Sequence, residues 1–412
     1  MKILNFGSCN VDYVYSMEHI VIPGETLPSH SLEVFPGGKG LNQSIAAARA
    51  GAKVYHAGAV GEDGEMLRRV LADNGVDVRF LRSVNDRSGH AIIQLSDAGE
   101  NSILLYRGAN GSMTEAYVDE VLSHFGAGDL LVLQNEINLV PYMIDRAAAR
   151  GMQILFNPAP FTPDLAGLDY SKITYLVLNE IEACGLGGEQ TPAQSLQRIR
   201  ATYPTLTVIM TLGADGCVYA DDKQTFAHPA YRVSVVDTTA AGDTFIGYFL
   251  FSIVRGESPK TAVRKASGAS ALAVSRKGAS TSIPFAGELK DALPHMVPLG
   301  GAVAREDRLR AQIDAYFEEH IATASLDELA ECVGYAKTYV GELVRRTTGL
   351  SFSALLQDKR CAMAAMLLLE SDLSVAQIIA RVGYRNENFF RSRFKQKYGV
   401  SPYQYKKKGG AV

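Results

Sequence analysis

The first 293 residues alternate short apolar runs with longer segments of helical character, and this alternation limits the fold more than any other feature of the chain. The clearest runs are rich in branched and aromatic side chains and cover residues 2–6, 130–133, 154–156, 175–178 and 207–210. Such runs, separated by helices, are typical of a parallel sheet covered by helices on both faces. We therefore predict an α/β domain with a mostly parallel, doubly wound sheet over residues 1–293.

Three other runs predict a smaller sheet beside the main one. Residues 88–95 and 101–106 flank the turn-forming segment 96–100 and are typical of a β-hairpin. Residues 31–35 alternate in character and supply a possible third strand. We expect these runs to form a small β lid.

The chain changes character after residue 293. Two prolines and two glycines fall within residues 294–301, so we place a linker at 294–304 and a second, all-helical domain at 305–408. This domain contains a repeat, because residues 325–335 align with residues 374–384. Each copy continues into a second helix that ends at a glycine, Gly349 or Gly399. A helix, a turn with glycine and a second helix form a helix-turn-helix, which is predicted here twice.

Charge is distributed unevenly along the chain. The whole sequence carries 41 Lys and Arg against 44 Asp and Glu, a net charge of −3, which by itself does not indicate a nucleic-acid partner. From Ser374 onward, however, nine basic residues accompany one acidic residue, Glu387. This contrast predicts a basic module attached to an acidic one.

The cysteines and the apolar runs indicate the compartment. The five cysteines are scattered without a Cys-x-x-Cys pair, which fits neither a disulfide framework nor a zinc site. The longest apolar run near the middle of the chain, residues 244–254, is about half the length that a membrane span needs. We expect a cytoplasmic protein without a membrane partner.

Residues 237–245 carry the clearest chemical motif, Asp-Thr-Thr-Ala-Ala-Gly-Asp-Thr-Phe. We expect a strand over 231–236 before it and a helix through Val254 after it. Small residues at a helix N-terminus let backbone N–H groups approach an anion, so the motif predicts a phosphate site with the Asp243 carboxylate beside it. The helix N-terminus is expected to hold the pKa of Asp243 down. A plain turn with Asp243 as a first-turn acid is the alternative.

A second motif, Gly-Gly-Lys-Gly at residues 37–40, precedes a helix over 44–50, and alone it is equally compatible with a glycine turn and a solvated lysine. Taken together, the motifs resemble the ribokinase (PfkB) family of carbohydrate kinases over nearly the whole first domain. The resemblance extends to residues 7–12, 61–64, 99–101, 108–110, 157–160, 179–182, 211–213, 276–279 and 282–284. It implies a ribokinase-like fold and ATP-dependent phosphorylation of a sugar hydroxyl.

The resemblance also implies roles for individual residues. Asp243 is expected to be the catalytic base, with Ala241 and Gly242 giving N–H groups to the transferred phosphoryl. The implied sugar ligands are Asn10, Asp12, Gly38, Lys39, Asn42 and Glu136. Donors and acceptors of this kind match a polyol. D-Ribose is the favoured sugar, while deoxyribose, fructose and nucleosides remain open.

Three cofactors follow from the same resemblance: ATP, Mg²⁺ and a monovalent cation, K⁺. The implied ATP-binding residues are Asn179, Thr211, Gly213, Gly216, Gly242 and Ser267, and Glu182 is expected to act indirectly on Mg²⁺. The residues expected around K⁺, mostly through backbone carbonyls, are Asp237, Thr239, Ala273, Arg276, Gly278 and Ser282.

The second domain resembles the AraC/XylS type of DNA-binding domain, most specifically at residues 382–384, 389–390, 394–395 and 399–402. A linking helix over 352–369 would hold recognition helices over 337–346 and 387–397, so that both enter successive major grooves of double-stranded DNA. The candidate DNA-binding residues are Lys337, Thr338, Arg345, Arg385, Asn386, Asn388, Arg391, Arg393 and Lys395. We expect Phe389, Phe390 and Phe394 to lie in the core, and residues 406–408 to make a nonspecific tail contact.

The first recognition helix departs from this pattern with Gly341 and Glu342, which weaken the helix and repel phosphate.

Two functions remain. One is a sugar kinase fused to a transcription regulator, and the other is a regulator whose weak or inactive kinase fold senses sugar or nucleotide. Intact Lys39, Asn179 and Asp243 favour the first. Family resemblance also implies a homodimer formed through the lid, and a change of DNA affinity on ligand binding would follow from it.

Overall fold

The computed structural model describes residues 1–98, 101–299, 312–313, 315–317, 319–333, 337–371, 373–384 and 386–407; the side chains of residues 338, 339, 342, 343, 346 and 347 are not part of that description. The chain divides into two compact units, Met1–Leu299 and Gly300–Val412. The division falls within the predicted linker, of which residues 300–304 lie outside the described residues. Among the described residues, no helix has the length and apolar character that crossing a bilayer requires.

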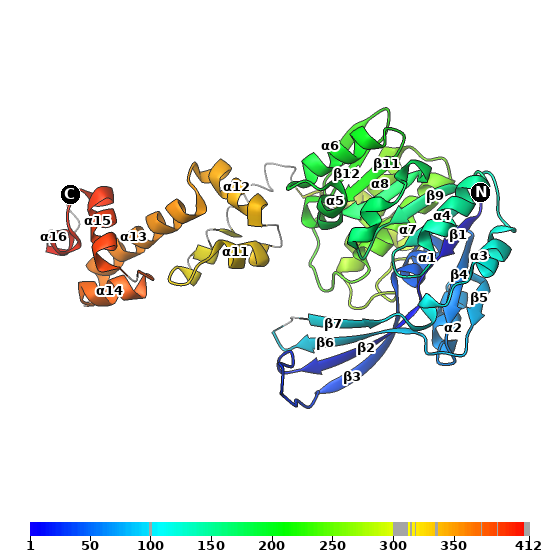
Figure 1. Cartoon of the computed structure of the whole chain (residues 1–412), viewed down its shortest axis with the longest axis horizontal. Coiled ribbons are helices and arrows are strands. Elements are labelled where there is room, and N and C mark those ends of the chain that lie inside the picture. Colours follow the sequence, from blue (N-terminus) through cyan, green and yellow to red (C-terminus); the bar gives the residue numbers. More distant parts are fainter. Residues whose placement is uncertain are drawn as a thin grey trace. The chain divides into compact units, whose positions relative to one another are not determined.

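A large mixed sheet forms the centre of the first unit (Figure 1). In the described part of the chain it has nine strands in the order β13-β12-β11-β10-β9-β8-β1-β4-β5. All neighbouring pairs are parallel except β11–β12 and β12–β13, which are antiparallel. The strands are β1 (Ile3–Phe6), β4 (Val54–Val60), β5 (Asp77–Ser83), β8 (Leu130–Gln134), β9 (Gln153–Asn157), β10 (Tyr175–Asn179), β11 (Thr207–Thr211), β12 (Cys217–Ala220) and β13 (Thr225–His228). The predicted doubly wound α/β fold is confirmed.

Helices cover both faces of this sheet because successive strand residues point to opposite sides. Ile3 packs in one apolar core, while Leu4 packs in the other. The helices of the first core are α1 (Lys39–Ala50), α2 (Glu65–Asp73), α7 (Ala241–Val254) and α8 (Pro259–Val274). Those of the second are α3 (Glu115–Leu122), α4 (Val140–Ala149), α5 (Glu180–Gly187) and α6 (Pro192–Thr202). The remaining helical segments are α9 (Ala286–Ala292), η1 (Gly108–Gly111), η2 (Pro163–Gly167), η3 (Tyr170–Lys172), η4 (Gly213–Asp215) and η5 (Leu293–His295).

A four-stranded sheet extends from the large one and forms the predicted lid (Figure 1). Its order is β3 (Ser31–Gly37), β2 (Asn10–Met17), β6 (Gly89–Ser96) and β7 (Asn101–Tyr106). The expected hairpin is the antiparallel pair β6 and β7, and residues 99–100 of its turn lie outside the described residues. Strand β2 was not predicted; it pairs with both β3 and β6 and places Asn10 and Asp12 where the lid begins.

The strand predicted over residues 231–236 is wrong. Only Tyr231 makes a β-bridge, and its partner is Pro298. Val235 and Val236 are exposed because no neighbouring strand covers them, although their sequence has strong β character.

The chain order places a crevice at the centre of the large sheet. From β1 the chain proceeds outward to β4 and β5, and from β8 it proceeds outward on the other side. The carboxyl ends of β1 and β8 therefore flank a topological switch point, where open α/β sheets bind their ligands.

The second unit is helical where it is described. Its helices are α11 (Leu326–Val333), α12 (Lys337–Thr348), α13 (Phe352–Glu370), α14 (Val375–Arg381), α15 (Glu387–Tyr398) and α16 (Pro402–Lys407). Residues 312–313, 315–317 and 319–320 are also helical. Helix α13 contributes Phe352 and Leu355 to one apolar cluster and Ala364 and Leu368 to the next, so it joins the two repeats as predicted.

The repeat is visible in the packing as well. Val340 and Val344 of α12 occupy the positions that Phe390 and Phe394 occupy in α15, and all four side chains are buried. Each copy therefore buries the same face of its second helix. Residues 334–336 of the first turn and Arg385 beside the second lie outside the described residues.

Candidate active site

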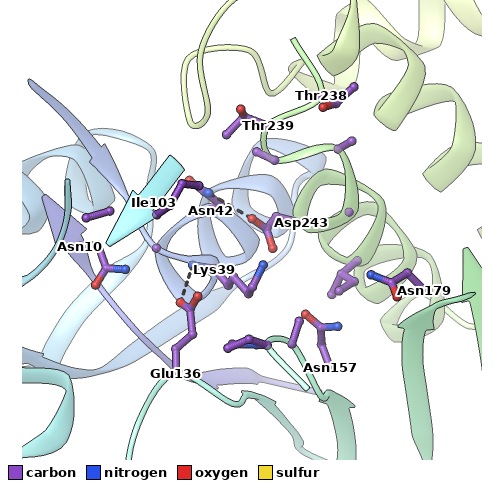
Figure 2. Close-up of a pocket in the computed structure, with 18 of the residues that line it drawn as sticks. Asn10, Lys39, Asn42, Ile103, Glu136, Asn157, Asn179, Thr238, Thr239 and Asp243 are labelled. Carbon is purple, nitrogen blue, oxygen red and sulfur yellow. Dashed lines mark hydrogen bonds between the residues drawn. The ribbon is translucent and has the colours of Figure 1, made fainter. Parts of the chain in front are cut away.

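A cavity of about 530 Å³ lies at the switch point (Figure 2). It is surrounded by the carboxyl ends of the central strands, the N-termini of α1 and α7, and the lid strands β2, β6 and β7. The predicted residues that line it are Asn10, Asp12, Gly38, Lys39, Asn42, Glu136, Asn179, Glu182, Thr211, Thr239, Ala241, Gly242 and Asp243. The structure therefore brings together motifs that lie more than 200 residues apart in the sequence.

Asp243 lies in the first turn of α7 and is buried. Both carboxylate oxygens accept hydrogen bonds, Oδ2 from Asn42 Nδ2 (3.1 Å) and Oδ1 from Gln43 Nε2 (3.0 Å). Burial raises the pKa of Asp243, while Lys39 and these two amides act in the opposite direction. The expectation that the helix N-terminus would hold this pKa down is wrong, because desolvation of the carboxylate outweighs the favourable contacts.

Lys39 lies among three acidic side chains. Figure 2 shows it extending from beside Glu136 toward Asp243. Burial disfavours its charge, but Asp243, Glu136 and Glu182 together raise its pKa. The backbone N–H of Lys39 donates to Glu136 Oε2 (3.1 Å), and the Ser8 hydroxyl donates to the same oxygen. The site thus holds a charged lysine within reach of developing negative charge.

The lid side of the cavity carries Asn10 and Asp12. Burial and the charge of Glu136 raise the pKa of Asp12 to about 7. Asn110 Nδ2 donates to Asn10 Oδ1 (2.7 Å), which fixes the orientation of that amide. Gly38 has a φ of 94°, and a Cβ there would lie 3.0 Å from the backbone N of Asn10. Glycine is therefore required where the chain turns into α1.

A second cavity of about 370 Å³ adjoins the first and is mostly apolar. The two share Thr211, Thr238, Ala241 and Gly242. The predicted ATP-binding residues that line the second are Thr211, Gly213, Gly216, Gly242 and Ser267. A polar compartment and an apolar one thus meet at the start of α7, beside Asp243.

The start of α7 has no side-chain cap, so its first N–H groups face this junction. Ala240, which precedes it, has a φ of 59°. The N–H of Ala241 donates to the Thr238 carbonyl oxygen (3.2 Å). An anion at this position would meet the N–H groups at the positive end of the helix dipole.

Asn179 and Glu182 line the cavity and also cap α5. Asn179 Oδ1 accepts from the Glu182 N–H (2.8 Å), and Glu182 Oε2 accepts from the Asn179 N–H (2.9 Å). This capping box orients both side chains. Burial raises the pKa of Glu182, so a cation beside it would favour its charged form.

The residues predicted around K⁺ lie in two adjoining loops. Asp237 connects the loops, since Oδ1 accepts from the Thr239 N–H (2.8 Å) and Oδ2 from the Gly278 N–H (2.9 Å). Ser282 is buried and its hydroxyl donates to the Ala279 carbonyl oxygen (2.8 Å), while the Ala273 carbonyl oxygen accepts from the Arg276 N–H (3.0 Å). The roles of these residues toward a cation stay predictions.

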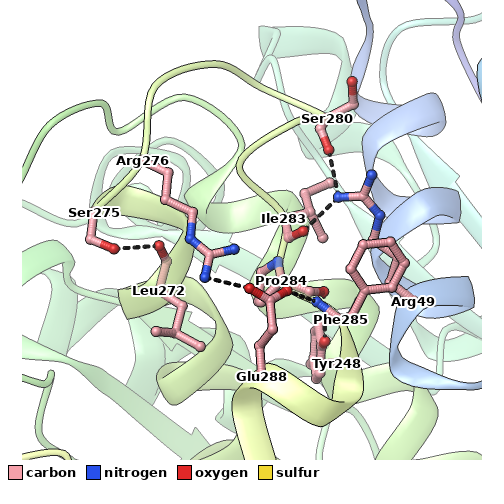
Figure 3. A network of polar contacts seen from close by, with 10 residues as sticks. All are labelled: Arg49, Tyr248, Leu272, Ser275, Arg276, Ser280, Ile283, Pro284, Phe285 and Glu288. Carbon is pink, nitrogen blue, oxygen red and sulfur yellow. Dashed lines mark hydrogen bonds and ion pairs between the residues drawn. The ribbon is translucent and has the colours of Figure 1, made fainter. Parts of the chain in front are cut away.

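Side chains around the second loop hold it in place (Figure 3). Arg276 Nη2 donates to Glu288 Oε1 (2.6 Å) at the start of α9. Arg49, at the end of α1, donates to the carbonyl oxygens of Ser280 (2.9 Å) and Ile283 (2.5 Å). Among the described residues, no group of three or more His, Cys, Asp or Glu side chains is arranged to hold a metal ion.

Sequence reasoning assigned no role to a chain of buried amides behind Asp243. Gln43 Oε1 accepts from Gln134 Nε2 (2.7 Å), which also donates to Asn5 Oδ1 (3.0 Å), and Gln43 Nε2 also contacts Asn157 Oδ1 (3.3 Å). Asn5, Gln134 and Asn157 are polar residues in otherwise apolar strands. That contrast is the signal in the sequence from which they are identifiable.

Helix α15 of the second unit presents several predicted DNA-binding residues. Asn386, Asn388, Arg391 and Lys395 are exposed. Asn386 Oδ1 also accepts from the Phe389 N–H (3.0 Å) and caps the helix. Arg391 pairs with Glu387 (3.4 Å) and Arg393 donates to Gln396 (3.1 Å).

One side chain of this region, Phe389, differs from the prediction. Phe390 and Phe394 are buried as expected, but Phe389 is 47% exposed because it lies on the opposite face of α15. Lys406 donates to the carbonyl oxygens of Ser371 (3.2 Å) and Leu373 (3.0 Å), so it has a structural contact within the unit. Lys408 lies outside the described residues.

In the first repeat, Lys337 pairs with Asp327 (2.7 Å) and Arg345 is exposed. The backbone of Thr338 belongs to α12, and its side chain is outside the description. Most of the predicted DNA-binding residues whose side chains the structure describes therefore belong to α15 and its N-cap.

Each of the two parts of the chain matches a known protein family. Residues 1–286 match the pfkB family carbohydrate kinase model, and residues 329–408 match a helix-turn-helix domain model. The chain is 35% identical over 298 residues to ribokinase from Haemophilus influenzae, covering 70% of this chain and 97% of that protein.

Solved structures of ribokinases are also similar to the first part of the chain. Ribokinase from Cryptococcus neoformans var. grubii, in complex with ADP, is 31% identical with a TM-score of 0.63 over 70% of this chain and 99% of that one. Ribokinase from Arabidopsis thaliana, complexed with ribose and ATP, is 29% identical to this chain. Its TM-score is 0.62, and the match covers 71% of this chain and 98% of that one. The chain therefore belongs to the pfkB family of carbohydrate kinases, as a ribokinase-like sugar kinase that continues into an AraC-type helix-turn-helix domain.

Proposed function

We propose that the first unit transfers the γ-phosphoryl group of ATP to the primary hydroxyl of D-ribose or a closely related sugar. The observation that carries this proposal is the position of Asp243 at the junction of a polar cavity and an apolar one. A sugar in the first and a nucleotide in the second would bring hydroxyl and γ-phosphate together at the start of α7. Such positioning supplies most of the catalysis in phosphoryl transfer.

Asp243 would accept the proton of the sugar hydroxyl as the new oxygen–phosphorus bond forms and the bond to the leaving ADP breaks. Its raised pKa suits it to hold that proton. Lys39 and the N–H groups of Ala241 and Gly242 would stabilise the charge of the phosphoryl group. To do so, the Ala241 N–H would release the Thr238 carbonyl oxygen and donate to the phosphoryl group instead.

The sugar would be held by Asn10, Asp12, Gly38, Lys39, Asn42 and Glu136. Asn42 gives the most direct support, because its Nδ2 is used by Asp243 while its buried Oδ1 has no hydrogen-bond partner in the described part of the protein. A sugar hydroxyl would supply the missing donor, since a buried acceptor left unpaired is costly. A ribokinase relative whose structure holds ribose and ATP supports D-ribose as the first choice.

Both implied cations fit the residues present. Mg²⁺ prefers oxygen ligands and retains several waters, which agrees with an indirect role for Glu182 at the phosphate end of the cavity. It would neutralise phosphate charge. A monovalent cation would be held by the carbonyl groups of the loops that Asp237 connects, and it would fix the loop that leads into α7.

We further propose that the second unit binds double-stranded DNA and regulates transcription. Two equivalent helix pairs on α13, with exposed basic side chains on α15, support this role. A homodimer through the lid is consistent with the exposed apolar edge strand β7, in which Leu104 is 67% exposed.

Phosphorylation assays with the purified full chain test the kinase proposal. ATP, Mg²⁺ and K⁺ would be supplied with D-ribose, deoxyribose, fructose or a nucleoside, and Asp243→Asn would serve as the control. Turnover that is highest with D-ribose and lost in the variant is expected. Saturable sugar binding without turnover on any sugar would contradict the proposal and favour a sensor.

A further inference from the structure

One wall of the apolar cavity comes from the last residues of the first unit. Tyr231 and Pro298 form an antiparallel bridge, which is flanked by two backbone hydrogen bonds. The Arg232 N–H donates to the Val297 carbonyl oxygen (2.9 Å), and the Leu299 N–H donates to the Ala230 carbonyl oxygen (2.7 Å). We call these paired segments, residues 230–232 and 297–299, the strap.

The strap lies directly against the predicted nucleotide loop. Residues 230–232 line the cavity, and so does Leu299. Gly216, which also lines the cavity, has a φ of 89°, and a Cβ at this residue would overlap the His228 carbonyl oxygen and crowd the Ala230 N. The loop of Gly216 and the strap are thus in contact and line the same cavity, so a ligand in that cavity would touch both.

The strap also lies at the point where the first unit continues into the second. The family match ends at residue 286, and Leu299 is the last residue of the first unit. The strap therefore belongs to the segment through which the kinase continues into the helical unit. Val297 is 58% exposed and Leu299 is half-buried, so the side chain that faces the cavity is that of Leu299.

We infer that Leu299 contacts the purine nucleoside of the bound nucleotide, and that nucleotide binding orders the strap from which the chain leaves the kinase. This inference rests on the proposed function, because it takes the apolar cavity as the nucleotide site. A flat base with apolar faces suits a mostly apolar cavity of about 370 Å³. Among the described residues, two flanking backbone hydrogen bonds join the strap, so contacts from a ligand would add substantially to its order.

Titration of the full chain with ADP by calorimetry tests the contact. Leu299→Ala removes apolar surface from the cavity and is expected to raise the Kd for ADP by a factor of about 5. Val297→Ala is the matched control, because it lies in the same strap, keeps the same backbone hydrogen bonds and does not line the cavity. An unchanged Kd in Leu299→Ala would overturn the inference.

Hydrogen exchange of the same proteins tests the ordering. ADP is expected to slow exchange at the amides of Arg232 and Leu299, which donate across the strap. D-Ribose alone is expected to leave them unchanged, and Leu299→Ala is expected to reduce the effect of ADP. Equal exchange with and without ADP would overturn the ordering.

The outcomes separate this inference from the proposed function. Wild-type protein that phosphorylates D-ribose, together with an unchanged Kd in Leu299→Ala, would overturn the inference alone. Wild-type protein that binds no ADP would overturn both.

Discussion

Asp243 is oriented by a relay of amides rather than by a single partner. Gln43 holds one carboxylate oxygen and Asn42 the other, so the plane of the carboxylate is fixed. Gln43 is itself held by Gln134, and Gln134 by Asn5, so the orientation is transmitted from the ends of two central strands. Buried amides are costly unless they are paired, which makes this relay a positioning device and not a neutral filling of the core.

Gln43→Met keeps the volume of the side chain and removes the hydrogen bond to Asp243. We expect kcat to fall about 10-fold or more with a smaller change in the KM for sugar, since a buried carboxylate oxygen loses its donor. Because that bond lowers the pKa of Asp243, the acid limb of the pH–rate profile should move to higher pH. Gln194→Met, an exposed change in α6, is the control, and an unmoved acid limb in Gln43→Met would contradict the positioning role.

Asp12, a proposed sugar ligand, lowers the stability of the folded protein where its carboxyl is ionised. Its pKa is about 7 in the folded protein against 3.8 for an exposed aspartate, so the folded state holds the proton more tightly. The stability due to this group is fully present below pH 3.8 and is lost as the pH rises through 7. The Asp12→Asn variant should therefore have a higher free energy of unfolding than wild type at pH 8. At pH 4 the two proteins should differ little.

Denaturant unfolding at both pH values checks this expectation. Asp291→Asn makes the same chemical change at an exposed position of α9 and is the matched control. The same Asp12 variant should bind sugar more weakly, because Asn removes an acceptor from the cavity. A stability difference for Asp12→Asn that is independent of pH would refute the assigned pKa.

At the scale of elements, α1 connects two parts of the site. It begins after Gly38 with Lys39 and Asn42, which line the first cavity, and it ends with Arg49 bound to the loop of Ser280. The predicted start of this helix, residue 44, was too late, because Gly40 disfavours helix in the sequence although α1 already begins at Lys39. The role of Arg49 was not predictable, because its partners are backbone carbonyls, which leave no trace in side-chain patterns.

The main sheet was predictable from its apolar runs, since strands buried on both faces need continuous apolar sequence. The strand expected over residues 231–236 was wrong for a related reason. Val233, Val235 and Val236 favour a strand locally, but pairing depends on a neighbour, and the one available is the short segment at Pro298. Phe389 likewise shows that an aromatic residue in a helix is not always a core residue.

Helix α15 offers two lysines with different predicted effects on DNA binding. Lys395 is exposed, whereas Lys397 pairs with Asp358 of α13 (2.6 Å). Lys395→Ala should weaken binding and reduce the salt dependence of log K by about 1, as loss of one phosphate contact would. Lys397→Ala should leave that slope nearly unchanged and lower stability by up to about 1 kcal/mol. Titrations with a duplex selected from a random pool by the full chain would measure both, and equal slopes in all three proteins would argue against phosphate contact by Lys395.

At the scale of the whole molecule, the fusion joins a sugar kinase to a helix-turn-helix unit through the residues next to the strap. If nucleotide binding orders residues 297–299, it restricts the point from which the chain continues into the helical unit, and we expect the two binding events to be coupled. Coupling of this kind is a free energy shared by two binding events, so it acts equally in both directions.

This reciprocity provides the sharpest test of why the two units occur in one chain. We expect saturating ADP to change the affinity for the selected duplex by a factor of about 5 or more, in the usual range for coupled sites. The duplex must then change the affinity for ADP by the same factor. Leu299→Ala should bring both factors toward one, and Val297→Ala should leave both as in wild type. Fluorescence anisotropy with labelled duplex and calorimetry with ADP measure the two sides separately. If both factors equal one in the wild-type protein, the kinase and the helix-turn-helix unit bind their ligands independently, and the strap serves the nucleotide site alone.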